Sequence, residues 1–337
     1  MRNFLPLAAI YIFATIFGVV GFIAWEARTD PPRTEADITV IGRTNYQYQF
    51  DRELGFAPRP NFSDVQVVGK IITPIYTDST GARIDTPNTP AKQHEIVAVG
   101  CSQTFGHGVR NEDTFASIIG NRLGKSVGNY AISGEGGVGS LLMLKRLPKS
   151  KIVIYGLWED HLRRNVSRCV GIPGPVCVEL PIIENGYIKL PETDNLFAAR
   201  DYLIETAHPT FQTDFKWTAY KLWRSIYRQH TATREEKIEA GKLVLTEMKK
   251  VSDILIVVYI PIYFQEINPA PRELVELAKA KGFILIDMHK RLSEFRARNV
   301  VFTLSDGHLN AVGHQAIADE VVPAIRQSGE CSGGSKC

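Results

Sequence analysis

The chain has 337 residues, of which 44% are hydrophobic and 22% charged, a composition typical of a globular protein with a sizeable core. Its formal net charge of +3 is small for this length, which excludes the strongly basic balance of a nucleic-acid-binding protein. We therefore expect a folded protein without a nucleic-acid partner.

The first part of the chain is apolar. No charge occurs from Phe4 to Trp25, and this stretch is long enough to cross a bilayer core, which takes about 20 residues. A cleavable signal peptide has an apolar core of only about 7 to 15 residues that ends in small residues, whereas this stretch ends at Trp25 and Glu26. We predict a membrane anchor over residues 1–28, inserted through residues 4–25, with a cleaved signal peptide as the alternative.

Four of the cysteines form two closely spaced pairs. Cys169 and Cys177 bracket a short glycine-containing loop, and so do Cys331 and Cys337. A local disulfide could close each loop, which would suit an oxidising compartment, and four unrelated thiols are the alternative. Together with the anchor, this predicts a single-pass membrane protein whose folded domain is extracytoplasmic, and periplasmic if the source is a Gram-negative bacterium.

The segment 29–93 is rich in Pro, Thr, Asp and Gly and contains short β-prone runs, which predicts a tether and a small lead-in rather than an independent domain. After it, short runs rich in Val and Ile alternate with segments of helical periodicity. The runs lie at 95–99, 127–132, 151–155, 254–260 and 283–286. This alternation predicts an α/β domain over 94–326, a three-layer α/β/α arrangement with a parallel five-stranded sheet.

Residues 166–234 interrupt this alternation with a Gly/Pro loop, followed by Tyr220, Trp223 and Tyr227 at helical spacing. We interpret these aromatic residues as an amphipathic helix packed on the domain. A cap over the site, or a surface resting on membrane or sugar chains, is the alternative. Residues 327–337 form a C-terminal tail.

Ligands of a parallel sheet bind at the carboxyl ends of its strands, so the residues after each run are the candidates for chemistry. Ser102 follows the first run, in the stretch AVGCSQTFGHGV, where its hydroxyl and N–H can face a ligand. Gly134 follows the second run and can supply another N–H donor. His308 has Asp306 two positions earlier, a carboxylate that can orient a general base, and Asn310 can cap the helix that follows. Each motif alone is more often a structural turn.

The ordered set of serine, glycine and Asp-x-His resembles the SGNH (GDSL-type) hydrolase superfamily over residues 95–324, apart from the insertion. The resemblance implies an SGNH/flavodoxin-like sheet, with Ser102 as nucleophile, His308 as base and Asp306 as its orienting acid. It also implies an oxyanion hole that contains Ser102 and Gly134, and it requires no metal and no organic cofactor. Residues 54–60 resemble the segment that precedes the catalytic part in membrane-tethered members.

Two positions depart from the family pattern. The aspartate before the nucleophile is Cys101 here, which makes Cys101 a rival nucleophile. The third block, normally Gly-x-Asn-Asp, reads YGLWEDH over residues 155–161 and has no asparagine where the family's third oxyanion donor should be. Asn165 or His161 could replace the missing oxyanion donor, whereas a Glu159 carboxylate would repel an oxyanion. Loss of one donor costs about two to three powers of ten in rate.

These features predict a serine esterase or deacetylase that acts on acyl esters, such as acylated glycans of an envelope or of an exported polysaccharide. Transfer of the acyl group to a sugar hydroxyl instead of water would make the same triad an O-acyltransferase. The alternative from another class is a catalytically silent SGNH-like domain that binds a glycan or a protein partner. The sequence leaves the acyl group and the oligomeric state open.

Overall fold

The computed structural model describes residues 47–68, 71–168, 179–192, 232–262 and 266–328, together with strand β1 (Thr39–Ile41) and positions 18 and 21. The two cysteine pairs, the aromatic helix around Trp223, nearly all of the predicted anchor and most of the C-terminal tail lie outside these residues. Among the residues that the structure describes, no helix is both long and apolar enough to span a membrane.

The centre of the molecule is a nine-stranded mixed sheet with the order β1-β4-β5-β6-β8-β7-β9-β12-β13. Five neighbouring strands are parallel to one another and form what we call the parallel half. They are β8 (Val127–Asn129), β7 (Ile96–Gly100), β9 (Ile152–Trp158), β12 (Ile254–Ile260) and β13 (Ile284–Asp287). Their order, with the first strand in the chain lying second in space, is that of a doubly wound sheet. The predicted parallel five-stranded sheet is therefore present.

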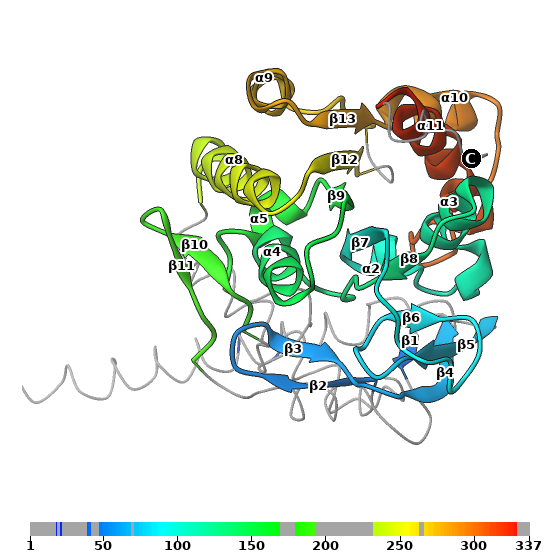
Figure 1. Ribbon diagram of the computed structural model, residues 1–337. Coiled ribbons are helices and arrows are strands. Elements are labelled where there is room, and N and C mark those ends of the chain that lie inside the picture. Colours follow the sequence, from blue (N-terminus) through cyan, green and yellow to red (C-terminus); the bar gives the residue numbers. More distant parts are fainter. Residues whose placement is uncertain are drawn as a thin grey trace, which may run out of the picture.

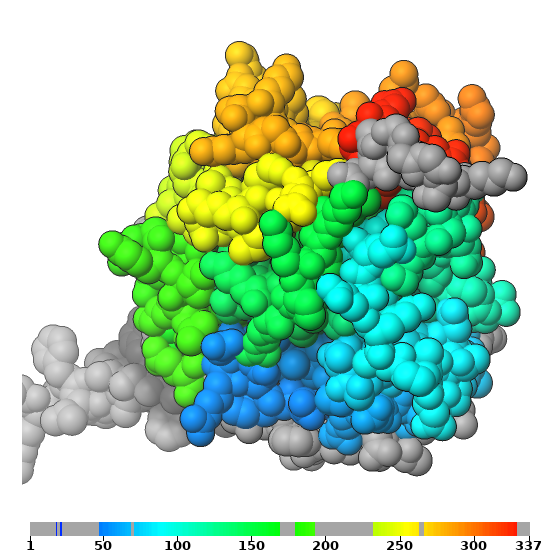
Figure 2. Space-filling model, viewed as in Figure 1, coloured from blue at the N-terminus to red at the C-terminus, as the bar shows by residue number. Residues whose placement is uncertain are grey.

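The sheet continues beyond β8 through strands of the lead-in. Strand β6 (Arg83–Ile84) pairs antiparallel with β8, and β5 (Ile71–Thr77), β4 (Ser63–Val68) and β1 follow, which we call the antiparallel half. A separate hairpin is formed by β2 (Tyr48–Asp51) and β3 (Gly55–Pro58). In Figures 1 and 2 these blue to cyan segments lie directly against the rest of the molecule. The lead-in is thus part of the same sheet, and not only a segment that precedes it.

Helices cover both faces of the parallel half (Figure 1). One face carries α4 (Gly137–Arg146), α5 (His161–Arg164), α8 (Arg234–Lys250) and α9 (Arg272–Lys281). The other carries α3 (Phe115–Leu123), α10 (His289–Ala297) and α11 (Ala311–Gln327). The hairpin of β10 (Ile182–Glu184) and β11 (Tyr187–Lys189) lies beside the first layer. The predicted three-layer α/β/α arrangement is present.

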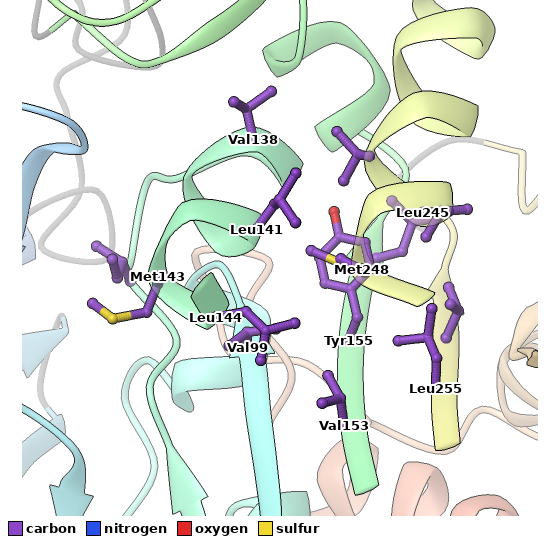
Figure 3. Packing of buried hydrophobic residues seen from close by; sticks show 14 of the residues in the cluster. Val99, Val138, Leu141, Met143, Leu144, Val153, Tyr155, Leu245, Met248 and Leu255 are labelled. Carbon is purple, nitrogen blue, oxygen red and sulfur yellow. The ribbon is translucent and has the colours of Figure 1, made fainter. Parts of the chain in front are cut away.

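Alternation along the strands divides the apolar core in two. In β7, Val97 and Val99 belong to the cluster under α4 and α8, whereas Ile96 and Ala98 belong to the cluster under α3 and α11. Figure 3 shows the first cluster, in which strand residues meet α4 and α8, with labelled side chains that include Val99, Val153, Leu255, Leu141, Leu144, Leu245 and Met248. Each large apolar side chain that is buried stabilises the fold by roughly 1.5–3 kcal/mol. Together the two clusters therefore stabilise the arrangement of strands and helices that positions the site.

The starts of α8 and α11 are specified by side-chain caps. The Thr233 hydroxyl accepts a hydrogen bond from Glu236 N–H, and the Glu236 carboxylate accepts one from Thr233 N–H, a capping box that starts α8. Asn310 accepts hydrogen bonds from Val312 N–H and Gly313 N–H at the start of α11, which confirms its predicted role as a cap. This cap also fixes the turn that precedes α11, which contains His308.

Candidate active site

The nucleophile turn is packed tightly on the sheet. Strand β7 ends at Gly100, and the short helix α2 (Ser102–Phe105) begins two residues later. Gly100 lies opposite Gly156 of β9, and a Cβ at Gly156 would lie 1.9 Å from Thr104 Oγ1. The two glycines therefore leave room for α2 against the carboxyl ends of the strands, which puts Ser102 at this edge of the sheet.

Ser102, His308 and Asp306 form a continuous hydrogen-bonded chain. The Oγ of Ser102 lies 2.9 Å from Nε2 of His308, and Nδ1 of His308 lies 2.9 Å from Oδ2 of Asp306. The other carboxylate oxygen, Oδ1, accepts a hydrogen bond from the backbone N–H of His308. A carboxylate can only accept a hydrogen bond, so the neutral His308 ring must carry its proton on Nδ1. Nε2 is then free to accept the hydroxyl proton of Ser102.

The acid of this chain stays ionised. Burial raises the pKa of Asp306, but the hydrogen bond from the His308 ring and its neighbouring charge outweigh burial, so that the net pKa lies below its ordinary value. An ionised Asp306 can orient the imidazole and stabilise an imidazolium that forms beside it.

The loop that carries His308 is held by the residue next to the nucleophile. Oε1 of Gln103 accepts a hydrogen bond from Leu309 N–H at 3.0 Å, and Nε2 of Gln103 lies 3.5 Å from the carbonyl oxygen of Gly307. Since Gln103 lies in α2, the base loop and the nucleophile turn are connected by more than the Ser102 contact itself.

Two backbone N–H groups are candidates for an oxyanion hole. Ser102 is the first residue of α2, and the first N–H that bonds within this turn is that of Thr104, to the carbonyl of Cys101. The loop with Gly134 lies beside the nucleophile turn because Ile132 N–H donates to the carbonyl of Gly100 at 2.9 Å. Gly134 has φ +95, a conformation that side chains rarely adopt.

The third predicted oxyanion donor lies elsewhere in the packing. Asn165 is buried at the end of α5, where its Oδ1 accepts a hydrogen bond from Val138 N–H at the start of α4. Its Nδ2 has no acceptor in the described part of the chain, and no hydrogen bond found there joins it to Ser102 or Gly134. The structure thus assigns Asn165 a contact that caps α4, and its role as an oxyanion donor stays a prediction.

His161, the other substitute considered, is part of the core. Its Nδ1 lies 2.7 Å from the Tyr155 hydroxyl, and the two rings are stacked. Burial lowers the pKa of His161 to about 3, so the ring is neutral at ordinary pH. Its contacts are those of a buried structural histidine.

The acidic residues of the third block have protein partners. Oε2 of Glu159 accepts a hydrogen bond from Ile262 N–H at 2.9 Å, next to the end of β12. The Asp160 carboxylate accepts hydrogen bonds from Arg163 and Arg164. The carboxylate of Glu159 is therefore held by the loop after β12.

Cys101, the rival nucleophile, is fully buried and unpaired. Burial raises the pKa of its thiol, which disfavours the reactive thiolate. The ring nitrogen that could act as a base lies instead against the hydroxyl of Ser102. These contacts favour Ser102 as the nucleophile.

Among the residues that the structure describes, one group could in principle hold a metal ion. His107, Asp306 and His308 offer ligand atoms that all lie within 4.8 Å of one another. However, Oδ2 of Asp306 and Nδ1 of His308 already bond to each other, and Nε2 of His308 faces Ser102. An ion here would have to displace the hydrogen-bonded chain, so the donor set fits a triad better than a metal.

A cavity of about 500 Å³ lies away from this chain of residues, between the β2–β3 hairpin and α4. Its lining includes His94, Tyr130 and Arg146 but none of Ser102, Asp306 and His308. The candidate active site is therefore defined by its hydrogen bonds and not by this cavity.

Three residues of the lead-in that were not among the predicted site residues support the loops of the site. The Tyr48 hydroxyl accepts a hydrogen bond from Ser133 N–H, next to Gly134. Gln66 accepts one from Gly108 N–H, and the Arg83 guanidinium donates to the carbonyls of Phe105, Gly106 and Val109. The one available signal was a glutamine inside the apolar run of β4, where a polar residue that faces the core needs a partner.

No family model and no curated protein sequence matches the chain. Distant structural similarity is found to SGNH/GDSL-type esterases and other hydrolases. An α/β hydrolase from the metagenome of Lake Arreo has 12% identity and a TM-score of 0.41, over 70% of this chain and 96% of that one. A G-D-S-L-family lipolytic protein from Veillonella parvula has 10% identity and a TM-score of 0.39, over 69% of this chain and 98% of that one. An acetylxylan esterase from Geobacillus stearothermophilus has 12% identity and a TM-score of 0.39, over 69% of this chain and 94% of that one.

Proposed function

We propose that the chain is a serine esterase that hydrolyses acyl esters, with Ser102 as nucleophile, His308 as general base and Asp306 as the acid that orients it. The observation that carries this proposal is the hydrogen-bonded chain, 2.9 Å from Ser102 Oγ to His308 Nε2 and 2.9 Å from His308 Nδ1 to Asp306 Oδ2. Ser102 and His308 are 206 positions apart in the chain, so the fold itself brings them together.

The chemistry follows from these contacts. As Ser102 Oγ attacks the ester carbonyl, Nε2 of His308 takes its proton, and Asp306 stabilises the imidazolium that results. The N–H groups of Ser102 and Gly134 would bind the oxyanion of the tetrahedral intermediate. His308 then gives its proton to the leaving alcohol, and a water molecule activated by the same ring releases the acyl group as an acid.

The proposed substrates are acylated glycans of an envelope or of an exported polysaccharide. This proposal is supported by the apolar N-terminal stretch, which predicts a membrane anchor and an extracytoplasmic domain. A sugar hydroxyl that takes the place of water in the second step would turn the same site into an O-acyltransferase.

A silent binding domain is the competing function, because Cys101 replaces the family aspartate and the third block lacks its asparagine. Neither departure disrupts the triad contacts. Cys101 is buried under α2, and the Glu159 carboxylate accepts a hydrogen bond from Ile262 N–H. With two backbone donors, and no contact in the described part of the chain that supplies a third, we expect an active but slow esterase, since one missing donor costs about 100- to 1000-fold in rate.

The test uses the full chain, purified in mild detergent, with p-nitrophenyl acetate as substrate and a fluorophosphonate as a label for active serines. We expect turnover and labelling of Ser102, both lost in Ser102→Ala and His308→Ala but retained in Cys101→Ala. Circular dichroism checks that each variant is folded. A folded wild-type protein that shows neither turnover nor labelling would favour the binding domain.

A further inference from the structure

A second histidine lies against the triad. His107, in the turn after α2, is buried, and its ring centroid lies 4.2 Å from that of His308 at an interplanar angle of 31°. Its Nε2 lies 3.5 Å from Oδ2 of Asp306, the oxygen that also bonds to His308 Nδ1. The mechanism above does not use this residue.

Gln66 determines where the proton of His107 is. Oε1 of Gln66 lies 2.8 Å from Gly108 N, and since a backbone N–H can only donate, this atom is the carbonyl oxygen of the amide. The amide nitrogen Nε2, 3.0 Å from His107 Nδ1, must then be the donor in that contact. Nδ1 of His107 is the acceptor, so the neutral ring carries its proton on Nε2, the atom that faces Asp306.

His107 remains neutral in this environment. The pKa of His107 is lowered to about 3, and burial is the main cause. The neighbouring His308 also lowers this pKa, by more than Asp306 raises it. The charged or titratable groups that act on the ring are His308, Asp306 and Arg83. At 3.5 Å, Nε2–H is in electrostatic contact with the carboxylate, and no other acceptor bonds to it in the described part of the chain.

We propose that His107, with its tautomer fixed by Gln66, is a positioning residue for the triad. Its Nε2–H directs a partial positive charge at Oδ2 of Asp306, and its ring lies against the His308 ring and limits the orientation of the base. Because His107 is neutral, it does not repel the imidazolium that forms on His308. This role rests on the proposed esterase activity, and it makes Gln66 of the lead-in strand β4 part of the support of the active site.

Substitutions at position 107 distinguish the effect of the N–H donor from the effect of the ring. His107→Gln keeps an N–H donor near the position of Nε2, whereas His107→Phe keeps a ring against His308 and removes the donor. We expect His107→Phe to lower kcat by about 10- to 100-fold, the range for a hydrogen-bonding partner of a charged group, with little change in KM. His107→Gln should restore most of this loss. His94→Phe, another buried histidine that lies at the start of β7 and away from the triad, is the matched control and should leave kcat unchanged.

Gln66→Glu tests the tautomer directly. At a pH high enough to ionise the buried carboxyl group, a carboxylate at position 66 can still accept from Gly108 N–H but cannot donate to Nδ1, so His107 must place a proton on Nδ1. We expect ring ¹⁵N chemical shifts to show a protonated Nε2 and an unprotonated Nδ1 for His107 in the wild type, and a protonated Nδ1 in Gln66→Glu. The chain has 8 histidines, and the spectrum of His107→Gln identifies the signal of His107.

The outcomes distinguish this role from the esterase proposal. A wild-type His107 protonated on Nδ1, or a His107→Phe variant with the kcat and pH–rate profile of the wild type, would overturn the role of His107 while the loss of activity in Ser102→Ala still supports the esterase. Absence of Ser102 labelling would overturn the esterase, whereas the ¹⁵N shifts would still report whether Gln66 fixes the tautomer.

Discussion

The two halves of the sheet bury different kinds of side chain. In the parallel half, every residue of β7 is buried, and apart from Gly100 all of them are apolar. In the antiparallel half, buried polar side chains include Gln66, Thr73 and Arg83. The parallel half carries the nucleophile turn at its strand ends, whereas two of these polar side chains bond to backbone groups of the segment 105–109 that follows it.

This division shows how a loop-borne site is kept rigid. The segment 105–109 is hydrogen-bonded to Gln66 and Arg83 of the antiparallel half as well as to Asn129 of β8, and the loop before Gly134 donates a hydrogen bond to Tyr48 of the β2–β3 hairpin. We therefore expect substitution of a triad residue to change activity far more than stability, and substitution of these supporting side chains to change both.

The largest effect is expected for Ser102→Ala in the parallel half. Loss of a nucleophilic serine in hydrolases with this triad lowers kcat by about 10⁴- to 10⁶-fold. The free energy of unfolding should change by less than about 1 kcal/mol, because a single hydroxyl is removed at the edge of the sheet. Ester turnover and urea unfolding of the same preparation measure both. A loss of stability comparable to that of the next variant would remove the distinction between the halves.

Arg83→Met should damage both properties. The Arg83 guanidinium donates to three carbonyls of the segment 105–109, at 2.5, 2.7 and 2.5 Å, and burial lowers its pKa to about 9. Removing a buried charged partner typically costs about 3–5 kcal/mol, and we expect urea unfolding to show a loss of that size together with reduced turnover.

Arg83→Lys is the matched control for Arg83→Met. It keeps the charge, but a single ammonium cannot reach three carbonyls with the geometry of a guanidinium. We expect it to recover only part of the loss. Full recovery would mean that charge, and not the three directed hydrogen bonds, supports this segment.

The parallel half could be predicted from the sequence because its signal is local. Runs such as Ile96–Gly100 and Ile254–Ile260 are apolar on both faces, which is what burial between two helix layers requires. Ser102 was expected at this edge because it follows a strand of the parallel sheet, but His308 lies in the loop between α10 and α11 and follows no strand, so only the family resemblance predicted their contact. Their catalytic roles remain our proposal.

The antiparallel half could not be predicted in the same way. Strand β5 contains Pro74 and alternates between exposed and buried residues, and β6 has only 2 residues, so no apolar run marks either of them. The partners of Arg83, and one of the two partners of Gln66, are backbone groups about 20 to 40 positions away, as in the contacts from Arg83 to Gly106 and from Gln66 to Gly108. A backbone group has no residue type, so such partners leave no pattern in the sequence.

Gly156→Ala tests the packing of the nucleophile helix within the parallel half. A Cβ at this position would lie 1.9 Å from Thr104 Oγ1, and overpacking of this kind costs about 1–3 kcal/mol. We expect a lower melting temperature and a moderate loss of turnover, since α2 carries Ser102. Adding Thr104→Ala removes the clashing atom, so a double-mutant cycle should show a favourable coupling of about 1 kcal/mol or more. Strict additivity of the two changes would contradict the close packing.

Glu135 provides a test through pH and a contrast with Arg83. Both side chains are fully or almost fully buried, but Arg83 donates to three carbonyls, whereas Glu135 accepts only from Gly136 N–H and its Oε1 has no partner in the described part of the chain. Burial raises the pKa of Glu135 from 4.5 to about 8. The parallel half therefore contains a carboxyl group that the folded state holds in its protonated form.

The sign of the pH dependence follows from this shift. Between pH 4.5 and about pH 8 the folded state keeps a proton that the unfolded state releases, so the stability present below pH 4.5 is lost as the pH rises through 8. Glu135→Gln is neutral at every pH and removes this contribution. In urea unfolding across this window, the stability of the variant relative to the wild type should rise with pH by up to about 1.4 kcal/mol per pH unit. If the free energies of unfolding of the two proteins changed with pH in the same way, Glu135 would ionise near its ordinary pKa, which would contradict the shift.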